Sequence, residues 1–498
     1  MSTIEQKKRL TPAPPSLPLV DQPTFPKQAK VELNKPTQRA NLRFATTTIR
    51  KKRQARVNER PDWQAMRVAG GNVKDRVLRH MDTYLEQLEV NLTKNGAQVH
   101  WAKDAEEANR IIVDIVKSKG VQEVVKVKSM ATQETDLNEA LEEAGIAAWE
   151  TDLAELIVQM GHDRPSHILV PAIHRNRAEV REIFLREMKL WGRPAPEDVE
   201  ADPAQLAGSA RLHLREKFLR AKVSISGANF AIAETGTLCV VESEGNGRMC
   251  LTLPDTLISL VGIEKMLPTF QDLELFTQLL PRSSTAEKMN PYTSMWTGVT
   301  PGDGPQEVHV VLMDNGRTSV LSDTYQRQAL RCIRCSACMN VCPVYERVGG
   351  HAYGSVYPGP IGSVLTPQLR GVGTNPVADS LPFASSLCGA CTEVCPVSID
   401  LADMLVDMRH KVTEAHRGGI PSFWDVAMGA GGRLMGSPMA WEASILAASS
   451  GKKMLPMVHG IGPTPMTGPL YGWTRARDMP MPAKESFRQW WKKNRKGE

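Results

Sequence analysis

Seven of the nine cysteines in this 498-residue sequence fall into two short runs. The first run begins at Cys332, places two residues between each of its first three cysteines and three residues before the last, and ends at Cys342, which precedes a proline. The second run, from Cys388 to Cys395, repeats the last three positions of the first and also ends in Cys-Pro. Closely spaced thiolates on one loop can hold three irons of a cubane, and a cysteine before proline points to a second cluster. The pattern predicts two iron–sulfur clusters rather than zinc, which prefers two separated pairs of ligands.

The spacing also predicts how the ligands are shared between the two clusters. The first cluster is expected to use one cysteine from the second run, giving the set Cys332, Cys335, Cys338 and Cys395. The second cluster is expected to use Cys342, Cys388 and Cys391. Counting back three residues from Cys388 gives Ser385 as a fourth ligand, or Ser386 if the loop shifts by one residue. The second cluster is therefore predicted to be a [3Fe-4S] cluster, or a [4Fe-4S] cluster with an open iron or a non-cysteine ligand.

Three arginines flank the first run, at positions 327, 331 and 334. Their positive charge would favour a reduced, more negative cluster, but a solvated helix face explains them equally well. Two cysteines, Cys239 and Cys250, lie outside both runs. Cys239 stands in an apolar stretch and is predicted to be a small core residue.

Weaker sequence signals indicate a small-anion site in addition to the clusters. Glu234, Asn246 and Arg248 lie on predicted loops that could converge on a small anion, with the arginine as the carboxylate-binding fork. These are the candidate catalytic residues, although ordinary hairpin turns explain them as well. Neither a nucleotide-binding glycine pattern after a strand nor a phosphate-binding loop is found, so hydride chemistry by this chain alone lacks a cofactor.

Strand and helix patterns alternate from residue 97 to residue 189, which predicts a parallel sheet with helices on both faces. A final strand of this series is expected at residues 167–172. Residues 223–233 and 237–243 are predicted to be strands that meet near Glu234. Helical and cysteine-rich sequence begins at Asp323. Residues 349–382 are expected to form a long connection. Residues beyond 410 are expected to form short helical pieces between glycines and prolines.

The two ends of the chain are basic and the body is mildly acidic. Residues 1–60 hold 14 Lys and Arg residues against 4 Asp and Glu residues, and residues 481–498 hold 6 against 2. The acidic body argues against nucleic-acid binding, and the basic run at 50–53 is interpreted as a solvated helix face. With no signal peptide pattern and no apolar stretch of spanning length, a cytoplasmic location is expected. Trp490 and Trp491 lie amid basic residues, a combination that favours binding to an anionic membrane surface or to an acidic partner. The alternative is a disordered, solubilising tail.

Three further segments carry a family resemblance. The sequences at 226–237, 244–248 and 260–265 resemble the lactate-utilisation (LUD) domain. The cysteine block, together with residues 358–362 and 386–391, is similar to the lactate-utilisation protein B family. This resemblance implies an α/β LUD domain related to CoA-transferases and sugar-phosphate isomerases, then an α-helical two-cluster ferredoxin domain and an irregular C-terminal region. The expected divisions are an extended or disordered arm (residues 1–44), the LUD domain (45–320), the ferredoxin-type domain (321–410) and a family-specific region with a basic tail (411–498).

The resemblance implies an iron–sulfur electron-transfer subunit of a bacterial complex that oxidises L-lactate to pyruvate. The implied partners are a cysteine-rich subunit of the heterodisulfide-reductase type and a small LUD-domain protein, with a quinone-linked or peripheral membrane acceptor. Activity is then expected from the complex rather than from this chain alone. Two alternatives stay open: a LUD-domain enzyme that binds a small carboxylic acid directly, and an iron–sulfur relay subunit of another dehydrogenase.

Overall fold

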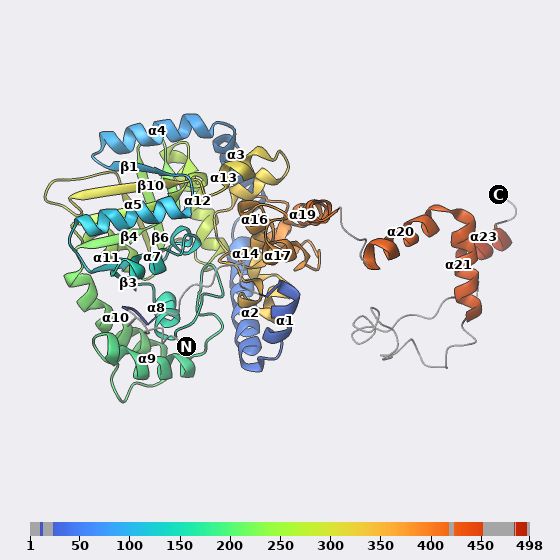
Figure 1. Cartoon of the computed structure of the whole chain (residues 1–498), viewed down its shortest axis with the longest axis horizontal. Coiled ribbons are helices and arrows are strands. Elements are labelled where there is room, and N and C mark those ends of the chain that lie inside the picture. The colour runs from blue at the N-terminus through green and yellow to red at the C-terminus, as the bar shows by residue number, and fades with distance from the viewer. Residues whose placement is uncertain (1–9, 13–22, 418–422, 452–482, 484, 496–498) are drawn as a thin grey trace, which may run out of the picture. The chain divides into compact units, whose positions relative to one another are not determined.

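The computed structural model describes residues 10–12, 23–417, 423–451, 483 and 485–495 (Figure 1). The chain divides into two units, residues 1–416 and residues 417–498. The first unit contains both cysteine runs and all the strands described below.

A six-stranded sheet forms the centre of the first unit, and every pair of neighbouring strands in it is parallel. In spatial order the strands are β1 (Gln98–Ala102), β10 (Glu307–Met313), β7 (Thr256–Gly262), β4 (Val223–Ser226), β2 (Glu123–Lys126) and β3 (Ala147–Glu150). Ile258 and Leu260 of β7 pack into a core with α5 (Ala105–Ser118) and α7 (Leu137–Glu143), while Leu257 and Val261 join a different core. The sheet is thus buried on both faces, and the predicted α/β architecture with a parallel sheet is confirmed.

Local signals explain why these helices begin where they do. The Asp104 carboxylate accepts the backbone N–H of Glu107 at 2.9 Å and caps α5. Three further helices form a separate core beside β2, and the second of them starts with a full capping box between Asn176 and Glu179. These helices are α8 (Leu153–Met160), α9 (Arg177–Trp191) and α10 (Pro203–Arg220).

A second sheet of four strands carries a hairpin. In spatial order its strands are β8 (Met266–Leu267), β5 (Phe230–Ile232), β6 (Thr237–Glu242) and β9 (Tyr292–Trp296). Strands β5 and β6 are antiparallel, as the sequence predicts for the turn near Glu234. The predicted strand at 223–233 is wrong in extent, because it splits into β4 and β5 in different sheets. The chain passes close to another loop between them, where a Cβ on Gly227 would lie 2.4 Å from Ser129 Oγ.

The strand predicted at residues 167–172 does not form, since this segment contains only bends and turns. Its neighbouring carbonyl groups are bonded by side chains rather than by a sheet partner. Tyr345 OH donates to the carbonyl of Ser166 at 2.6 Å, and Lys128 Nζ donates to the carbonyl of Ile168. The prediction is therefore wrong, because the apolar segment lies against the cysteine-rich part instead of joining the sheet.

The cysteine-rich part consists of short helices, as the resemblance to a helical ferredoxin domain implies. The connection predicted at 349–382 is itself helical, and α16 in its middle has nine buried residues. The elements are α13 (Arg317–Ser322), η3 (Gln326–Arg331), α14 (Ala337–Asn340), α15 (Pro343–Val348), η4 (His351–Tyr353), α16 (Gly359–Arg370), α17 (Pro376–Ser380), η5 (Leu381–Phe383), α18 (Ala390–Val394) and α19 (Leu401–Ala415).

The extended arm predicted for residues 1–44 is wrong for residues 25–44, because α1 (Phe25–Glu32) and α2 (Pro36–Asn58) are helices. A proline lies in the first turn of each helix, where its missing N–H costs no hydrogen bond. Packing against the cysteine-rich part stabilises both helices. Phe25 contacts Tyr353 with ring centroids 5.0 Å apart, and Leu42 is fully buried. The chain continues through α3 (Trp63–Arg79), α4 (Met81–Lys94) and, after β2, the short α6 (Met130–Glu134).

Most described residues of the second unit lie in helices, in agreement with the short helical pieces predicted beyond residue 410. The described part is therefore more regular than the resemblance implies. Its helices are α20 (Phe423–Gly436), α21 (Pro438–Gly451) and α23 (Phe487–Asn494). The last begins with a capping box between Ser486 and Gln489 and exposes both Trp490 and Trp491. Among the described helices, none has the length and apolar character needed to cross a membrane.

Candidate iron–sulfur centre

Four cysteines from the two runs line one cavity: Cys332, Cys335, Cys338 and Cys395. The first three come from the loop between η3 and the end of α14, and the fourth follows α18 directly. Cys335, Cys338 and Cys395 are no more than 8 % exposed. Ile168 and Ile361 contribute apolar walls to the same cavity. Thiols from distant parts of the chain are therefore brought together in a water-poor site of the kind that holds a cubane cluster.

The other three cysteines form a second group closer to the surface. Cys342 caps α15 and is 7 % exposed, and Cys391 in α18 is 8 % exposed, whereas Cys388 is open to solvent. Burial raises the pKa of Cys391 to about 11, and the thiols of Cys342 and Cys388 add to this effect. Cys388 and Cys391 belong to the same run, and no cysteine of this group comes from outside the two runs.

The same reasoning applies to the first group. Burial raises the pKa of Cys335 to about 12, and the neighbouring thiols of Cys332 and Cys395 raise it further. Such thiols hold their protons at neutral pH unless a metal displaces them. The donor set of each group, soft sulfur in an enclosed site, fits iron–sulfur clusters better than hard cations.

Ser385, the predicted fourth ligand of the second group, precedes Cys388 in the same loop. Its hydroxyl oxygen accepts the backbone N–H of Leu387 at 3.1 Å. Its carbonyl oxygen accepts a hydrogen bond from Arg409 Nη2 at 2.9 Å. Both contacts fix the loop that leads into the second cysteine run.

The two cysteines outside the runs are buried away from both groups. Cys239 lies in β6 and Cys250 in α11 (Asn246–Thr252), and both are fully buried. Burial raises the pKa of each thiol to about 12. Cys239 is the core residue that its apolar surroundings predict.

Of the three flanking arginines, Arg334 alone lines the four-cysteine cavity. Arg331 is bound elsewhere, with Nε 2.6 Å and Nη2 2.7 Å from the Asp75 carboxylate. Arg327 Nε donates to the carbonyl of Asp323 at 3.2 Å. The structure thus separates three arginines that the sequence presents as equivalent.

Two further arginines beside the cysteines were missed by sequence reasoning. Arg53 of α2 is buried and donates through Nη2 to the carbonyl of Val394 at 2.8 Å. Arg67 of α3 donates through Nε to the carbonyl of Cys395 at 2.7 Å. The interpretation of residues 50–53 as a solvated face is therefore wrong for Arg53. Helical periodicity could have indicated this, because four consecutive residues on a helix cannot all face solvent when one side is packed.

A buried network of charged side chains connects Arg334 with the parallel sheet. Arg334 Nη2 donates to Glu264 Oε1 at 3.3 Å, and Arg317 Nε donates to Glu264 Oε2 at 2.5 Å. Arg317 Nη1 and Nη2 donate to the Glu134 carboxylate at 2.9 and 3.0 Å, and Tyr357 OH donates to it at 2.5 Å. All five side chains are at most 8 % exposed. The network is therefore an internal ion-pair system rather than a surface feature.

The fold explains why these groups meet. Glu264 and Arg317 follow the carboxyl ends of β7 and β10, and such ends lie along one edge of a parallel sheet. Burial raises the pKa of Glu264, but Arg317 and the neighbouring cations outweigh it and hold that pKa well below its ordinary value. Lys74 of α3 donates through Nζ to the carbonyl of Glu264 at 2.5 Å, and burial lowers its pKa to about 7. Glu264 lies in a sequence segment that carries the family resemblance, but its ionic role depends on tertiary contacts.

The predicted anion-binding set of Glu234, Asn246 and Arg248 does not come together. Glu234 lies before β6 and accepts the backbone N–H of Phe270 at 2.8 Å, where α12 (Phe270–Ser283) starts. Asn246 lies beyond the other end of β6 and donates through Nδ2 to Thr151 Oγ1 at 3.2 Å. A six-residue strand spans roughly 20 Å, so Glu234 is far from the other two. This prediction is wrong.

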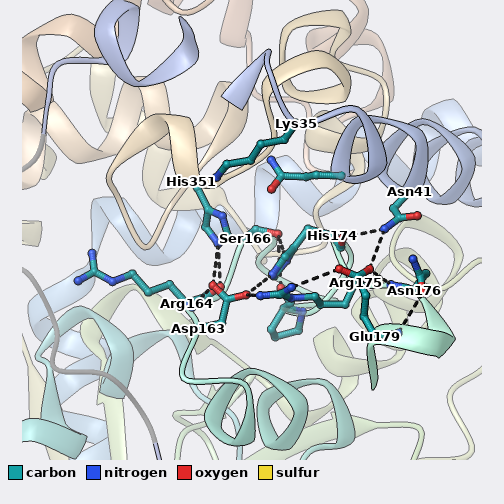
Figure 2. A network of polar contacts seen from close by, with 12 residues as sticks. Lys35, Asn41, Asp163, Arg164, Ser166, His174, Arg175, Asn176, Glu179 and His351 are labelled. Carbon is teal, nitrogen blue, oxygen red and sulfur yellow. Dashed lines mark hydrogen bonds and ion pairs between the residues drawn. The ribbon is translucent and has the colours of Figure 1, made fainter. Parts of the chain in front are cut away.

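Figure 2 shows a second polar cluster, in which Asp163 lies between His174, Arg175 and His351. His174 Nε2 lies 2.7 Å and Arg175 Nη2 2.5 Å from Asp163 Oδ2. The other carboxylate oxygen accepts the backbone N–H of Arg164 at 2.8 Å. Two imidazoles and a carboxylate are common metal ligands, but this carboxylate is already neutralised and saturated with donors. The cluster instead ties the segment around Asp163 to η4 of the cysteine-rich part.

Comparison with protein families divides the chain into three matched regions. Residues 85–313 match the LUD domain, residues 328–399 match a 4Fe-4S dicluster domain, and residues 409–496 match the C-terminal domain of lactate utilisation protein B. The cysteine-rich part is therefore an iron–sulfur domain, which confirms the prediction of iron–sulfur clusters.

Related proteins match over nearly the whole chain. Lactate utilization protein B 1 of Bacillus mycoides is 42 % identical over 94 % of this chain and 96 % of its own length. Lactate utilization protein B of Oceanobacillus iheyensis is 43 % identical over 90 % of this chain and 92 % of its own. A crystal structure of a DUF162 family protein from Deinococcus radiodurans covers 47 % of this chain and 98 % of its own, at 16 % identity and a TM-score of 0.26, a similarity too low to carry an argument. On the strength of the two relatives and the three matched regions, the chain belongs to the lactate utilization protein B family.

Proposed function

We propose that this chain is the iron–sulfur electron-transfer subunit of a complex that oxidises L-lactate to pyruvate. The observation that carries the proposal is the convergence of four thiols in one buried cavity, with three more beside it, in a family named for lactate utilisation. Each cluster, when bound, accepts and passes on single electrons. Two adjacent clusters suit a relay rather than a storage site.

The proposed ligands of the first cluster are Cys332, Cys335, Cys338 and Cys395. Those of the second are Cys342, Cys388 and Cys391, with Ser385 or another group at the fourth position. The exposure of Cys388 supports a second cluster near the surface, where electron exchange with another subunit is direct. The chain encloses the first cluster and surrounds it with arginines.

The proposed partners are a cysteine-rich subunit of the heterodisulfide-reductase type and a small LUD-domain protein. A LUD fold related to CoA-transferases, and a peripheral contact of α23 with a membrane, are further parts of this proposal. The exposed aromatic and basic side chains of α23 support such a contact.

The test is lactate-driven reduction of the clusters, followed by low-temperature electron paramagnetic resonance under anaerobic conditions. The full chain co-purified with both proposed partners is expected to show reduced clusters after addition of L-lactate, and the chain alone is expected to show none. Reduction of the isolated chain by L-lactate would instead support a LUD-domain enzyme that binds the acid directly. No reduction in the complete complex would contradict the proposal.

A further inference from the structure

Three hydrogen-bond donors around the four-cysteine cavity have no acceptor among the described residues. They are Nε and Nη1 of Arg334 and Oγ of Ser336, all of them buried. Both residues line the cavity together with the four thiols. A buried donor without an acceptor is destabilising. Such donors therefore indicate an acceptor that belongs in the cavity.

The backbone at these two residues gives a second and independent indication. Arg334 and Ser336 have φ values of 62° and 65°, in the left-handed region. This conformation is unfavourable for residues other than glycine, because their Cβ atom approaches the following carbonyl oxygen. A large side chain at such a position is best explained by a contact that the side chain itself makes.

The guanidinium of Arg334 is also held firmly from outside the cavity. Its Nη2 donates to Glu264 at 3.3 Å, and its plane lies over the ring of Tyr357 at 4.5 Å from the centroid. Glu264 is fixed in turn by Arg317. These contacts leave the remaining N–H groups preorganised, because little side-chain freedom is lost when they meet an acceptor.

We propose that Arg334 binds the first cluster directly: its Nε and Nη1 donate hydrogen bonds to cluster sulfur atoms and so stabilise the reduced form. One-electron reduction adds a negative charge to the cluster, and a nearby guanidinium favours the more negative state. Glu264 of the LUD domain orients this guanidinium, so the LUD domain takes part in setting the reduction potential. The inference rests on the proposed ligand set of the first cluster.

The experiment is an anaerobic redox titration of the full-length chain, with each cluster followed by electron paramagnetic resonance. Arg334→Gln is expected to shift the reduction equilibrium of the first cluster about tenfold toward the oxidised form, which lowers its potential by about 59 mV for one electron. Arg331→Gln is the matched control, because Arg331 lies in the same segment but binds Asp75. It is expected to leave both potentials at their wild-type values.

Arg334→Lys keeps the positive charge but loses the fixed pair of N–H groups. It is expected to shift the potential in the same direction by a smaller amount, at wild-type iron content. If Arg334→Gln fails to assemble the first cluster, this second variant decides the question. A wild-type potential in Arg334→Lys, or an equal shift in Arg334→Gln and Arg331→Gln, would overturn the inference. The titration uses a chemical reductant, so its outcome is independent of whether lactate and the partners reduce the chain.

Discussion

At the scale of single residues, the two groups of cysteines differ in how completely the chain surrounds them. Three of the first group, Cys335, Cys338 and Cys395, are at most 8 % exposed, whereas Cys388 of the second group is exposed. Ser385 is the proposed fourth ligand of the second group. A serine hydroxyl binds iron only when the metal drives its deprotonation, and oxygen suits the soft cluster less well than sulfur. We therefore expect the second cluster to be the more labile one.

We expect air to convert the second cluster of the unmutated chain into an oxidised three-iron form while the first cluster persists. Ser385→Cys should supply the missing thiolate and yield a stable four-iron cluster. Ser386→Cys tests the alternative register, because Ser386 takes the place of the fourth ligand if the loop shifts by one residue. The measurement is electron paramagnetic resonance before and after exposure to air. Two four-iron clusters of equal air stability in the unmutated chain would show that a fourth ligand comes from elsewhere.

A single histidine makes stability depend on pH. His167 is 2 % exposed, and its Nε2 donates to Asn340 Oδ1 at 3.2 Å. Burial, with the nearby Lys128 ammonium, lowers the pKa of His167 to about 3. An unfolded histidine titrates near 6.5, so below that pH the unfolded chain binds a proton that the folded chain does not. The contribution of His167 to stability is therefore complete above pH 6.5 and is lost as the pH falls toward 3.

The check is the free energy of unfolding in urea at pH 7.5 and at pH 5.5, under anaerobic conditions. His167→Gln should lose less stability between these two values than the unmutated chain does, by up to about 1.4 kcal/mol per pH unit titrated. His410→Gln, at an exposed position of α19, serves as the control and should keep the full pH dependence. Identical pH profiles for the unmutated chain and His167→Gln would contradict this account.

The residues that the sequence predicts well are those whose chemistry is local. Cysteine spacing needs no knowledge of the fold, because one loop supplies three thiols. The charges of Arg53 and Glu264 could not be placed in the same way, since charged residues are usually exposed and only tertiary packing shows that these are buried. The anion-binding prediction failed for the opposite reason: Glu234 is close in sequence to Asn246 and Arg248, but β6 separates it from them in space.

At the scale of elements, the N-terminal helices serve as part of the iron–sulfur domain. Helix α2 contributes Leu42 to the core shared with the cysteine-rich part, and its Arg53 binds the carbonyl of Val394 within the second run. The alternating strands and helices were predictable because hydrophobic periodicity is local. Helices α1 and α2 were not, since their sequence is polar and proline-containing and their stability comes from docking.

Shortening a core side chain of α2 tests this docking. Leu42→Ala should lower the free energy of unfolding by about 2–5 kcal/mol, because it leaves a cavity at a fully buried position. Phe44→Ala, two residues away in the same helix, should change it by less than about 0.5 kcal/mol, since Phe44 is 74 % exposed. Urea unfolding of both variants gives the comparison. Equal effects would mean that α2 does not stabilise this part of the chain.

At the scale of the whole molecule, the LUD domain and the iron–sulfur domain are joined by charged groups as well as by apolar packing. The network from Arg334 through Glu264 and Arg317 to Glu134 runs from the edge of the cysteine cavity to the parallel sheet. The cluster of Asp163, His174 and His351 makes a second connection (Figure 2). The LUD domain thus contributes charged residues to the surroundings in which the iron–sulfur domain binds its clusters.

The central claim, that this chain holds two iron–sulfur clusters, is tested most directly by metal and sulfide content after anaerobic purification. The account predicts roughly seven to eight irons per chain with matching acid-labile sulfide. Cys335→Ser should remove about half of that iron, whereas Cys239→Ser, at a fully buried position in β6, should leave it unchanged. Zinc at one or two equivalents per chain with negligible iron would contradict the account.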